Sequence, residues 1–275
     1  MKPPGVMRAC ALSLLILALL ACSREQSSGT ALPNGQVAPA PASTTIVVDL
    51  ADVVEATPNY VIGISYPKSA VKYPQLAAEL KRYAESARAD LLQAAQSRDA
   101  SDKTGLYDLS LSFTEVLESP DLVAYAADGS SFTGGAHGAP LLARFVWMPQ
   151  QGKRLTSADL VPTERGWQAI ASYVREELHT ALSQRVDADE LPPGDRAEVV
   201  KSAGRMIDEG TGSDPDNFAQ FEPVVNASGK VTALRFVFAP YQVGPYSDGT
   251  QTVEVPASVL LPHIAPEYRN LFVRG

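Results

Sequence analysis

Apolar and polar residues alternate along several short stretches of the chain, a pattern that predicts β-strands with one buried face. The alternation is clearest over residues 60–66, which Pro67 ends, and over residues 107–117. Runs of β-branched and other apolar residues predict further strands at residues 45–50, 122–127, 141–148, 221–226, 231–238 and 252–255. Asp128-Gly129 predicts a turn directly after the strand at 122–127, and residues 227–230 predict a hairpin turn.

Apolar residues recur at helical spacing in three other stretches. The first helix is predicted to begin near Pro74, which suits a first helical turn. Its apolar face carries Leu76, Leu80, Tyr83, Ala87, Leu91 and Ala94. A second helix is predicted over residues 164–184 and a third over residues 195–207, which Gly204 interrupts, with a loop at 187–195 between them. Because strands and helices fall in segregated runs, the pattern favours an α+β fold over a doubly wound sheet.

The start of the chain has the features of a processed leader. Lys2 and Arg8 accompany a short apolar run at residues 9–20, as in a secretion signal. Leu19-Leu20-Ala21-Cys22 is typical of a bacterial lipobox, so residues 1–21 are interpreted as a lipoprotein signal peptide and Cys22 as the lipidation site. The alternative is ordinary cleavage that leaves Cys22 as a free thiol. Residues 22–45 are expected to be the lipidated cysteine and a flexible linker, since small and polar residues dominate them.

Charge and cysteine content change with this processing. The formal net charge of the whole chain is −8, from 23 basic and 31 acidic residues. Removal of residues 1–21 takes away Lys2 and Arg8 but no acidic residue, so the mature charge becomes −10. Cys10 leaves with the same segment, so no intrachain disulfide is expected. An acidic chain argues against a nucleic-acid partner and favours basic partners.

The residues that usually mark catalytic or metal sites are sparse. His137, His179 and His263 are isolated from one another, without the paired spacing of a zinc site, so no metal and no cofactor are expected. No nucleophile elbow and no phosphate-binding loop occur in the sequence. Glycosidase carboxylates are recognised by their separation in space, so the sequence leaves that chemistry open. We expect a protein that is not an enzyme.

A glycine-rich stretch, residues 131–138, offers the first candidate site. Gly134 and Gly135 favour backbone conformations that other residues resist, and they lie between Phe132 and His137. One interpretation is a ligand-contacting loop held between two strands, with Phe132, Gly134, Gly135 and His137 as candidate binding residues. The other is a tight connection in which His137 hydrogen-bonds to neighbouring backbone.

A second candidate is the turn-rich aromatic segment at residues 240–249. Tyr241 and Tyr246 provide rigid, amphipathic contact area for a ligand. The alternative is that both tyrosines pack under the segment and only fix its path. Trp147 and Trp167 are expected to lie in the core.

Three motifs together resemble a known family of extracytoplasmic domains. They are Ile64-Ser65-Tyr66-Pro67, Phe132-Thr133-Gly134-Gly135-Ala136-His137-Gly138 and Tyr241-Gln242-Val243-Gly244-Pro245-Tyr246. Their order resembles that in the sensing domain of the RsiV anti-sigma factor and in the non-catalytic N-terminal region of PdaC peptidoglycan deacetylases. The resemblance implies two associated subdomains, each with a helix packed on a mostly antiparallel sheet. A PdaC-like N-terminal subdomain is expected at residues 46–138 and an RsiV-like C-terminal subdomain at 139–265.

The resemblance also implies a place and a role. We expect a lipid-anchored protein of the bacterial cell envelope, and Ser23 after the cysteine favours the outer membrane, on its periplasmic side. The leading hypothesis is a binding lipoprotein that captures lysozyme or another basic wall-active protein. The alternative is a module that binds peptidoglycan glycan strands, and a cell-wall hydrolase or deacetylase ranks third. Transcriptional signalling is not expected, because we find no segment for it in the sequence.

Overall fold

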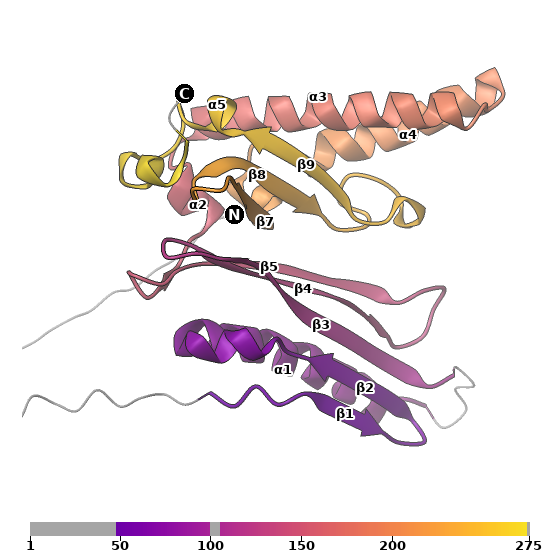
Figure 1. Ribbon diagram of the computed structural model, residues 1–275. Coiled ribbons are helices and arrows are strands. Elements are labelled where there is room, and N and C mark those ends of the chain that lie inside the picture. The colour runs from indigo at the N-terminus through magenta and orange to yellow at the C-terminus, as the bar shows by residue number, and fades with distance from the viewer. Residues whose placement is uncertain (1–47, 100–104, 274–275) are drawn as a thin grey trace, which may run out of the picture. The chain divides into compact units, whose positions relative to one another are not determined.

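The computed structural model describes residues 48–99 and 105–273, and Figure 1 shows how their helices and strands follow one another. The predicted signal peptide, the lipidation site Cys22, the linker and the first part of the strand expected at 45–50 lie outside the described residues. The described residues belong to one compact unit. None of the helices in the described ranges is long and apolar enough to cross a membrane.

The first sheet has six strands in sequence order. They are β1 (Val53–Ala56), β2 (Tyr60–Ser65), β3 (Tyr107–Glu118), β4 (Val123–Phe132), β5 (Ala139–Met148) and β6 (Lys153–Arg154). All neighbours pair antiparallel except β2 and β3, which are parallel because the helix α1 (Pro74–Gln96) connects them. One face of α1 packs on this sheet, and its buried residues are Leu76, Ala77, Leu80, Ala84, Ala87 and Leu91.

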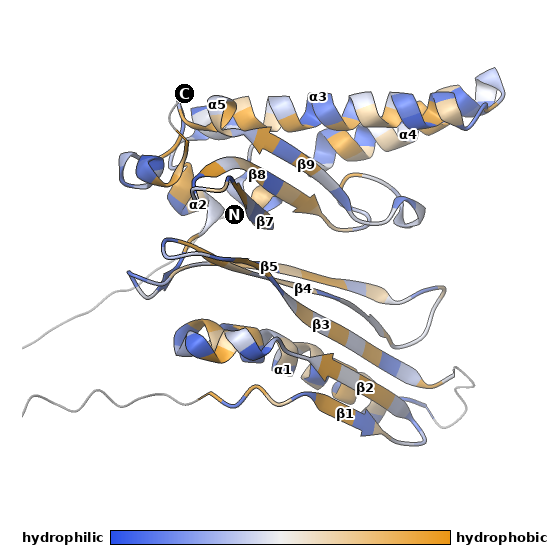
Figure 2. Ribbon diagram, in the orientation of Figure 1, coloured by the Kyte–Doolittle hydropathy of each residue, from blue (hydrophilic) through white to orange (hydrophobic). Residues whose placement is uncertain are grey.

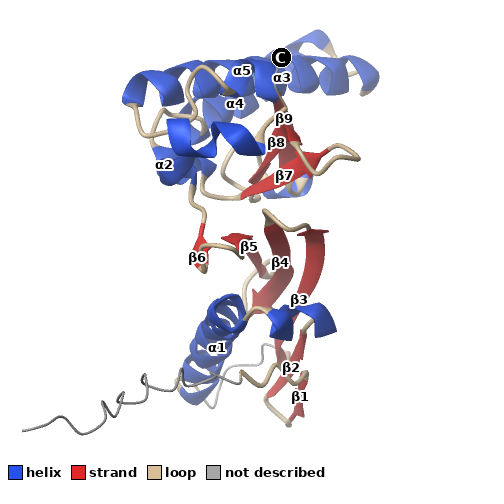
Figure 3. Ribbon diagram, turned by 60° about the vertical axis from the view of Figure 1, so that its left-hand side comes forward, coloured by secondary structure: helices blue, strands red, loops and turns tan. Residues whose placement is uncertain are grey.

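The second sheet has three antiparallel strands, β7 (Phe221–Val225), β8 (Val231–Phe238) and β9 (Gln251–Pro256). The short helix α2 (Ser157–Leu160) leads into the long helices α3 (Glu164–Ala188) and α4 (Pro193–Gly210), and α5 (Ala257–Leu260) follows β9. Figure 3 shows α3 and α4 beside β7–β9, and α1 beside the strands of the first sheet. Along α3, apolar and hydrophilic residues alternate in the helical manner (Figure 2), as the sequence pattern predicts.

Strands β4 and β5 are each buried on both faces along about half of their length. In β4, Val123 and Tyr125 belong to the core under α1, whereas Ala124 belongs to the core of the second sheet and its helices. In β5, Trp147 belongs to the core under α1 and Val146 to the core of the second sheet. Double burial explains why residues 122–127 and 143–148 read as nearly continuous apolar runs rather than as alternating strands. The predicted core positions of Trp147 and Trp167 are confirmed, at 4% and 3% exposure.

The structure corrects three details of the sequence interpretation. The turn predicted at Asp128-Gly129 is wrong, because β4 continues through both residues to Phe132, paired with β3 and β5. Residues 48–50 are not a strand, and the first strand is instead β1. The loop predicted at 187–195 is shorter, since α3 ends at Ala188 and α4 begins at Pro193.

The predicted α+β class is confirmed by the two sheets and the helices packed on them. The subdomain boundary expected between residues 138 and 139 falls between β4 and β5, which are paired neighbours in one sheet. The first sheet therefore continues past that position as far as Arg154.

Candidate functional site

The loop that joins β4 to β5 contains the glycine-rich motif. Gly134 and Gly135 have φ values of 107° and 97°, in the region that L-residues with a Cβ rarely occupy. Gly138 has no positive φ, and a Cβ there would lie 3.3 Å from the Ser130 Cβ atom, so this glycine accommodates a close neighbour. The two left-handed glycines reverse the chain at the tip and leave His137 exposed at its surface.

The segment between β8 and β9 contributes the tyrosines. Tyr241 has a φ of 73°, which is uncommon for a residue with a side chain, and its backbone N–H donates to the Gly244 carbonyl at 3.0 Å. Next to it, the Gln242 side chain donates to the Asn217 carbonyl at 2.9 Å, and Val243 is buried. These contacts anchor the turn from below, so the Tyr241 side chain stays 53% exposed above it.

The two loops meet in a cluster of three rings, which we call the aromatic cluster: His137, Tyr241 and Tyr246. The His137 ring stacks on Tyr246 with 3.7 Å between centroids and 13° between planes. His137 Nε2 lies 2.7 Å from the Tyr241 hydroxyl, and the two tyrosine rings are 5.7 Å apart. Residues about a hundred positions apart in sequence thus form one contact surface that joins the two sheets.

The contacts of His137 define its hydrogen-bonding state. Its Nδ1 lies 3.1 Å from the Gly138 carbonyl oxygen, which can only accept, so Nδ1 carries the hydrogen. In the neutral ring Nε2 then accepts, and the Tyr241 hydroxyl donates to it. The bond to neighbouring backbone and the bond to the second loop are both present. His137 therefore orders the cluster and remains accessible to a ligand.

The candidate residues predicted from the sequence divide into two groups. His137, Tyr241 and Tyr246 come together in the aromatic cluster, and Gly134 and Gly135 shape the loop that presents His137. Phe132 ends β4, half-buried, and no ring contact joins it to the cluster among the described residues.

The other two histidines lie on α3 and after α5. His179 Nε2 lies 3.0 Å from an Asp208 carboxylate oxygen on the neighbouring helix, and His263 follows α5. Within residues 48–99 and 105–273, no three His, Cys, Asp or Glu side chains lie together as metal ligands would.

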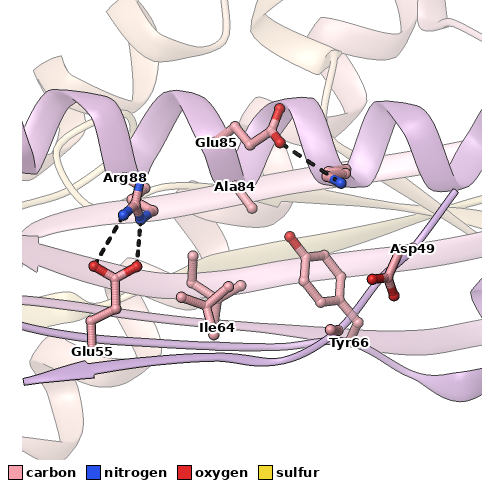
Figure 4. Close-up of a pocket in the computed structure, with 10 residues that line it drawn as sticks. Asp49, Glu55, Ile64, Tyr66, Ala84, Glu85 and Arg88 are labelled. Carbon is pink, nitrogen blue, oxygen red and sulfur yellow. Dashed lines mark hydrogen bonds and ion pairs between the residues drawn. The ribbon is translucent and has the colours of Figure 1, made fainter.

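A second candidate lies under α1, where a cavity of about 290 Å³ opens between the helix and strands β1 and β2. Figure 4 shows Arg88 of α1 and Glu55 of β1 joined by two contacts across it, at 2.8 and 3.0 Å. The Tyr66 ring stands between the strands and the helix, and burial, followed by Glu85 and Asp52, raises its pKa to about 12. Tyr66 belongs to a motif singled out in the sequence, but its ring packs on Phe113, with centroids 4.9 Å apart. The ring contact of Tyr66 and the ion pair between Arg88 and Glu55 support a structural role for the residues that line this cavity.

Part of the chain matches a known protein family. Residues 159–258 match the family described as Protein of unknown function (DUF3298). This DUF3298 segment contains Tyr241 and Tyr246 but not His137, so the aromatic cluster includes a residue outside the family model. No curated protein matches the chain.

Two solved structures from the DUF3298 family are similar to this chain. A DUF3298 family protein from Pseudomonas aeruginosa PAO1 is 16% identical with a TM-score of 0.53, covering 84% of this chain and 100% of that chain. A member of the family from Bacteroides fragilis NCTC 9343 is 14% identical with a TM-score of 0.48, covering 80% and 94%. At these identities the likeness to the Pseudomonas protein shows a shared fold and nothing about a ligand.

Sequence reasoning missed the residues that hold the cluster in place. A Cβ at Gly210, the last residue of α4, would lie 1.9 Å from the Gln242 carbonyl oxygen, so α4 must end in glycine to admit the Tyr241 turn. Gln242 lies in the motif Tyr241-Gln242-Val243-Gly244-Pro245-Tyr246, so the sequence did point to it. Nothing in the sequence indicated the role of Gly210, since a glycine at a helix end is common for reasons of capping alone.

Proposed function

We propose that this chain is an envelope-anchored binding lipoprotein whose ligand-contacting surface is the aromatic cluster, and that it captures lysozyme or a similarly basic wall-active protein. The observation that carries the proposal is the geometry of that cluster. Two loops, each held between strands of a different sheet, present an exposed tyrosine and an exposed histidine side by side. Binding residues are commonly found on loops positioned by a rigid scaffold, and tyrosine is enriched at protein interfaces.

Charge supports a basic partner. The mature chain would carry −10, and opposite net charges steer association and raise its rate at low ionic strength. Anchoring through a lipid on Cys22 would hold the domain in the envelope, where a wall-active protein meets it. We propose that the cluster binds its partner without catalysis.

The test is to titrate residues 23–275, which contain the whole compact unit, with lysozyme at low and at physiological salt. We expect a complex that weakens as salt rises. Tyr241→Asn removes the exposed ring while keeping a residue that tolerates positive φ, and should weaken binding at least tenfold. Val71→Ala is the matched control, because Val71 is also 53% exposed but lies in a 3₁₀ turn before α1. If no complex forms at either salt concentration, the proposal is contradicted.

A glycan strand is the second candidate, supported by one observation. Tyr241 keeps an exposed ring on which a sugar could stack, whereas the Tyr246 ring is covered on one side by His137. Sedimentation with purified peptidoglycan distinguishes the two candidates. Retention that tolerates salt and is lost in Tyr241→Asn favours the glycan, and retention that salt abolishes favours charge-driven protein capture.

A further inference from the structure

Strand β9 forms an edge of the three-stranded sheet. It pairs with β8 along its full length, from Gln251 opposite Phe238 to Pro256 opposite Ala233. On its other side, no backbone hydrogen bond joins β9 to any of the described residues. In an antiparallel pair, alternate residues point their N–H and C=O groups away from the partner strand. The outer edge of β9 therefore presents backbone groups that an added strand could pair with.

A groove lies along this edge. It has a volume of about 380 Å³, with Glu177, Leu178 and Ala181 of α3 on one wall and residues 251–254 of β9 on the other. Leu178 and Val253 are buried and give the groove an apolar base, whereas Glu177 and Thr252 are exposed at its sides. An edge strand beside a helix, with an apolar base between them, is the geometry in which an extended peptide adds to a sheet.

The corresponding groove of the first sheet is bridged by an ion pair. There the edge strand β1 is tied to α1 by the two contacts between Glu55 and Arg88 (Figure 4). In the β9 groove, no hydrogen bond or ion pair links Glu177 or Ala181 to β9 among the described residues. The second groove is therefore open to an incoming strand.

Charge indicates what kind of strand would enter. Glu177 has no ion-pair partner among the described residues, and Glu176 is its neighbour on α3. Burial, followed by Glu177 and Glu176, raises the pKa of Tyr173 one turn earlier on α3. On the other face of β9, Glu254 pairs with Arg235 at 2.6 Å and remains about half exposed. Both sides of an added strand would thus face carboxylates.

We propose that β9 accepts an extended cationic segment of a partner protein as a fourth strand of the β7-β8-β9 sheet, in the groove between β9 and α3. Main-chain bonds to β9 would supply the pairing. Aliphatic side chains would meet Leu178 and Ala181, and lysine or arginine side chains would meet Glu177 and Glu254. This surface is separate from the aromatic cluster and does not rest on the function proposed for it.

The probe is the peptide acetyl-Lys-Val-Lys-Lys-Lys-Val-amide, whose two valines and fourth-residue lysine share one face and can meet α3 together. It is titrated into residues 23–275 by calorimetry at low salt. We expect saturable binding and at least tenfold weaker binding of the counterpart with glutamate at each lysine. Glu177→Gln should weaken binding of the lysine peptide about two- to fivefold, as expected for a partly exposed charge pair. Glu198→Gln, which removes an exposed carboxylate from α4, should leave it unchanged.

Two N-methylated peptides test strand pairing without changing the protein. One carries methyl groups on the amides of its first, third and fifth residues, and the other on the second, fourth and sixth. Only one of these sets can face β9, so one peptide should lose binding and the other should retain it. Hydrogen exchange should slow at alternate β9 amides when the unmethylated peptide is bound.

Equal binding of the two methylated peptides would overturn the proposal, because main-chain pairing would then contribute nothing. Loss of peptide binding in Tyr241→Asn would also overturn it, by placing the peptide on the aromatic cluster. Failure of lysozyme to bind, with the peptide result intact, would contradict the proposed function and leave the β9 groove standing.

Discussion

Replacing Arg144 with methionine should destabilise the fold more than any exposed ion-pair change. Arg144 lies on β5 with its side chain 7% exposed, and its Nε contacts a Glu222 carboxylate oxygen of β7 at 2.6 Å. Its Nη1 also contacts Asp128 at 3.0 Å and donates to the Ala143 carbonyl. Methionine fills a similar length but donates no hydrogen bond. The Glu222 carboxylate, 11% exposed, would then lose its closest partner while staying buried.

The expected size follows from how Glu222 is held. Removing one partner of a buried ion pair generally costs 3–5 kcal/mol, because the other charge remains buried. Here Arg235 Nη1 still lies 3.3 Å from the second Glu222 oxygen, so we expect the low end, about 3 kcal/mol. For a unit of this size that is a fall of roughly 6–12 °C in Tm.

Thermal unfolding followed by calorimetry and circular dichroism measures this change. Arg235→Met is the control: its side chain is 39% exposed, so solvent screens its pairs and the loss should stay below about 1 kcal/mol. The double variant Arg144→Met with Glu222→Leu should be more stable than Arg144→Met alone, since no unpaired buried charge remains. A loss below about 1 kcal/mol in Arg144→Met, or a double variant as unstable as the sum of the single changes, would refute the reasoning.

Three further predictions address other parts of the chain. Gly135→Ala should cost about 1 kcal/mol in unfolding free energy, because the φ of Gly135 is 97° although the space around it is open. Gly63 also lies in open space but has no positive φ, so Gly63→Ala should cost less. Equal losses in the two variants would contradict this. Burial raises the pKa values of Tyr66 and Tyr125 to about 12, so the neutral phenols stabilise the fold fully below pH 10 and this contribution is lost between about pH 10 and 12. Phenolate absorbance, assigned with Tyr66→Phe and Tyr125→Phe, should show both groups ionising late, and ordinary titration near pH 10 would exclude the effect. Cys22→Ser should release the processed protein from membranes, and continued pelleting of a processed variant would show that Cys22 is not the anchor.

The helices were predictable because their apolar spacing is set by one neighbouring layer. Leu76, Leu80 and Leu91 recur on the α1 face that packs on the sheet, and the predicted start at Pro74 is confirmed. The extent of β4 was not predictable, because Asp128-Gly129 has the local chemistry of a turn. Pairing on both sides overrides that preference, and a Cβ at Gly129 would lie 2.0 Å from the Ser110 carbonyl oxygen, so this glycine serves close strand packing instead.

The candidate site was predictable in its residues but not in its geometry. His137, Tyr241 and Tyr246 stood out as unusual residues in glycine- and proline-rich segments, and the structure brings all three together. Nothing in the local sequence encodes the 2.7 Å contact between His137 and Tyr241, because it depends on how two sheets meet. The left-handed backbone of Tyr241 also has no sequence signal, since tyrosine is not a residue that favours it.

The cluster and the buried ion pair depend on the same junction. His137 is carried by the loop before β5 and the tyrosines by the loop after β8, while Arg144 of β5 and Glu222 of β7 connect the same two sheets through the core. The backbone N–H of Arg144 also donates to the Gln220 side chain at 2.7 Å, so the junction is fixed in register as well as in distance. A change at this junction therefore shifts one wall of the cluster against the other. The hydrogen bond between His137 and Tyr241 is the exposed contact that would break first, because solvent can replace it whereas the core contacts have no such substitute.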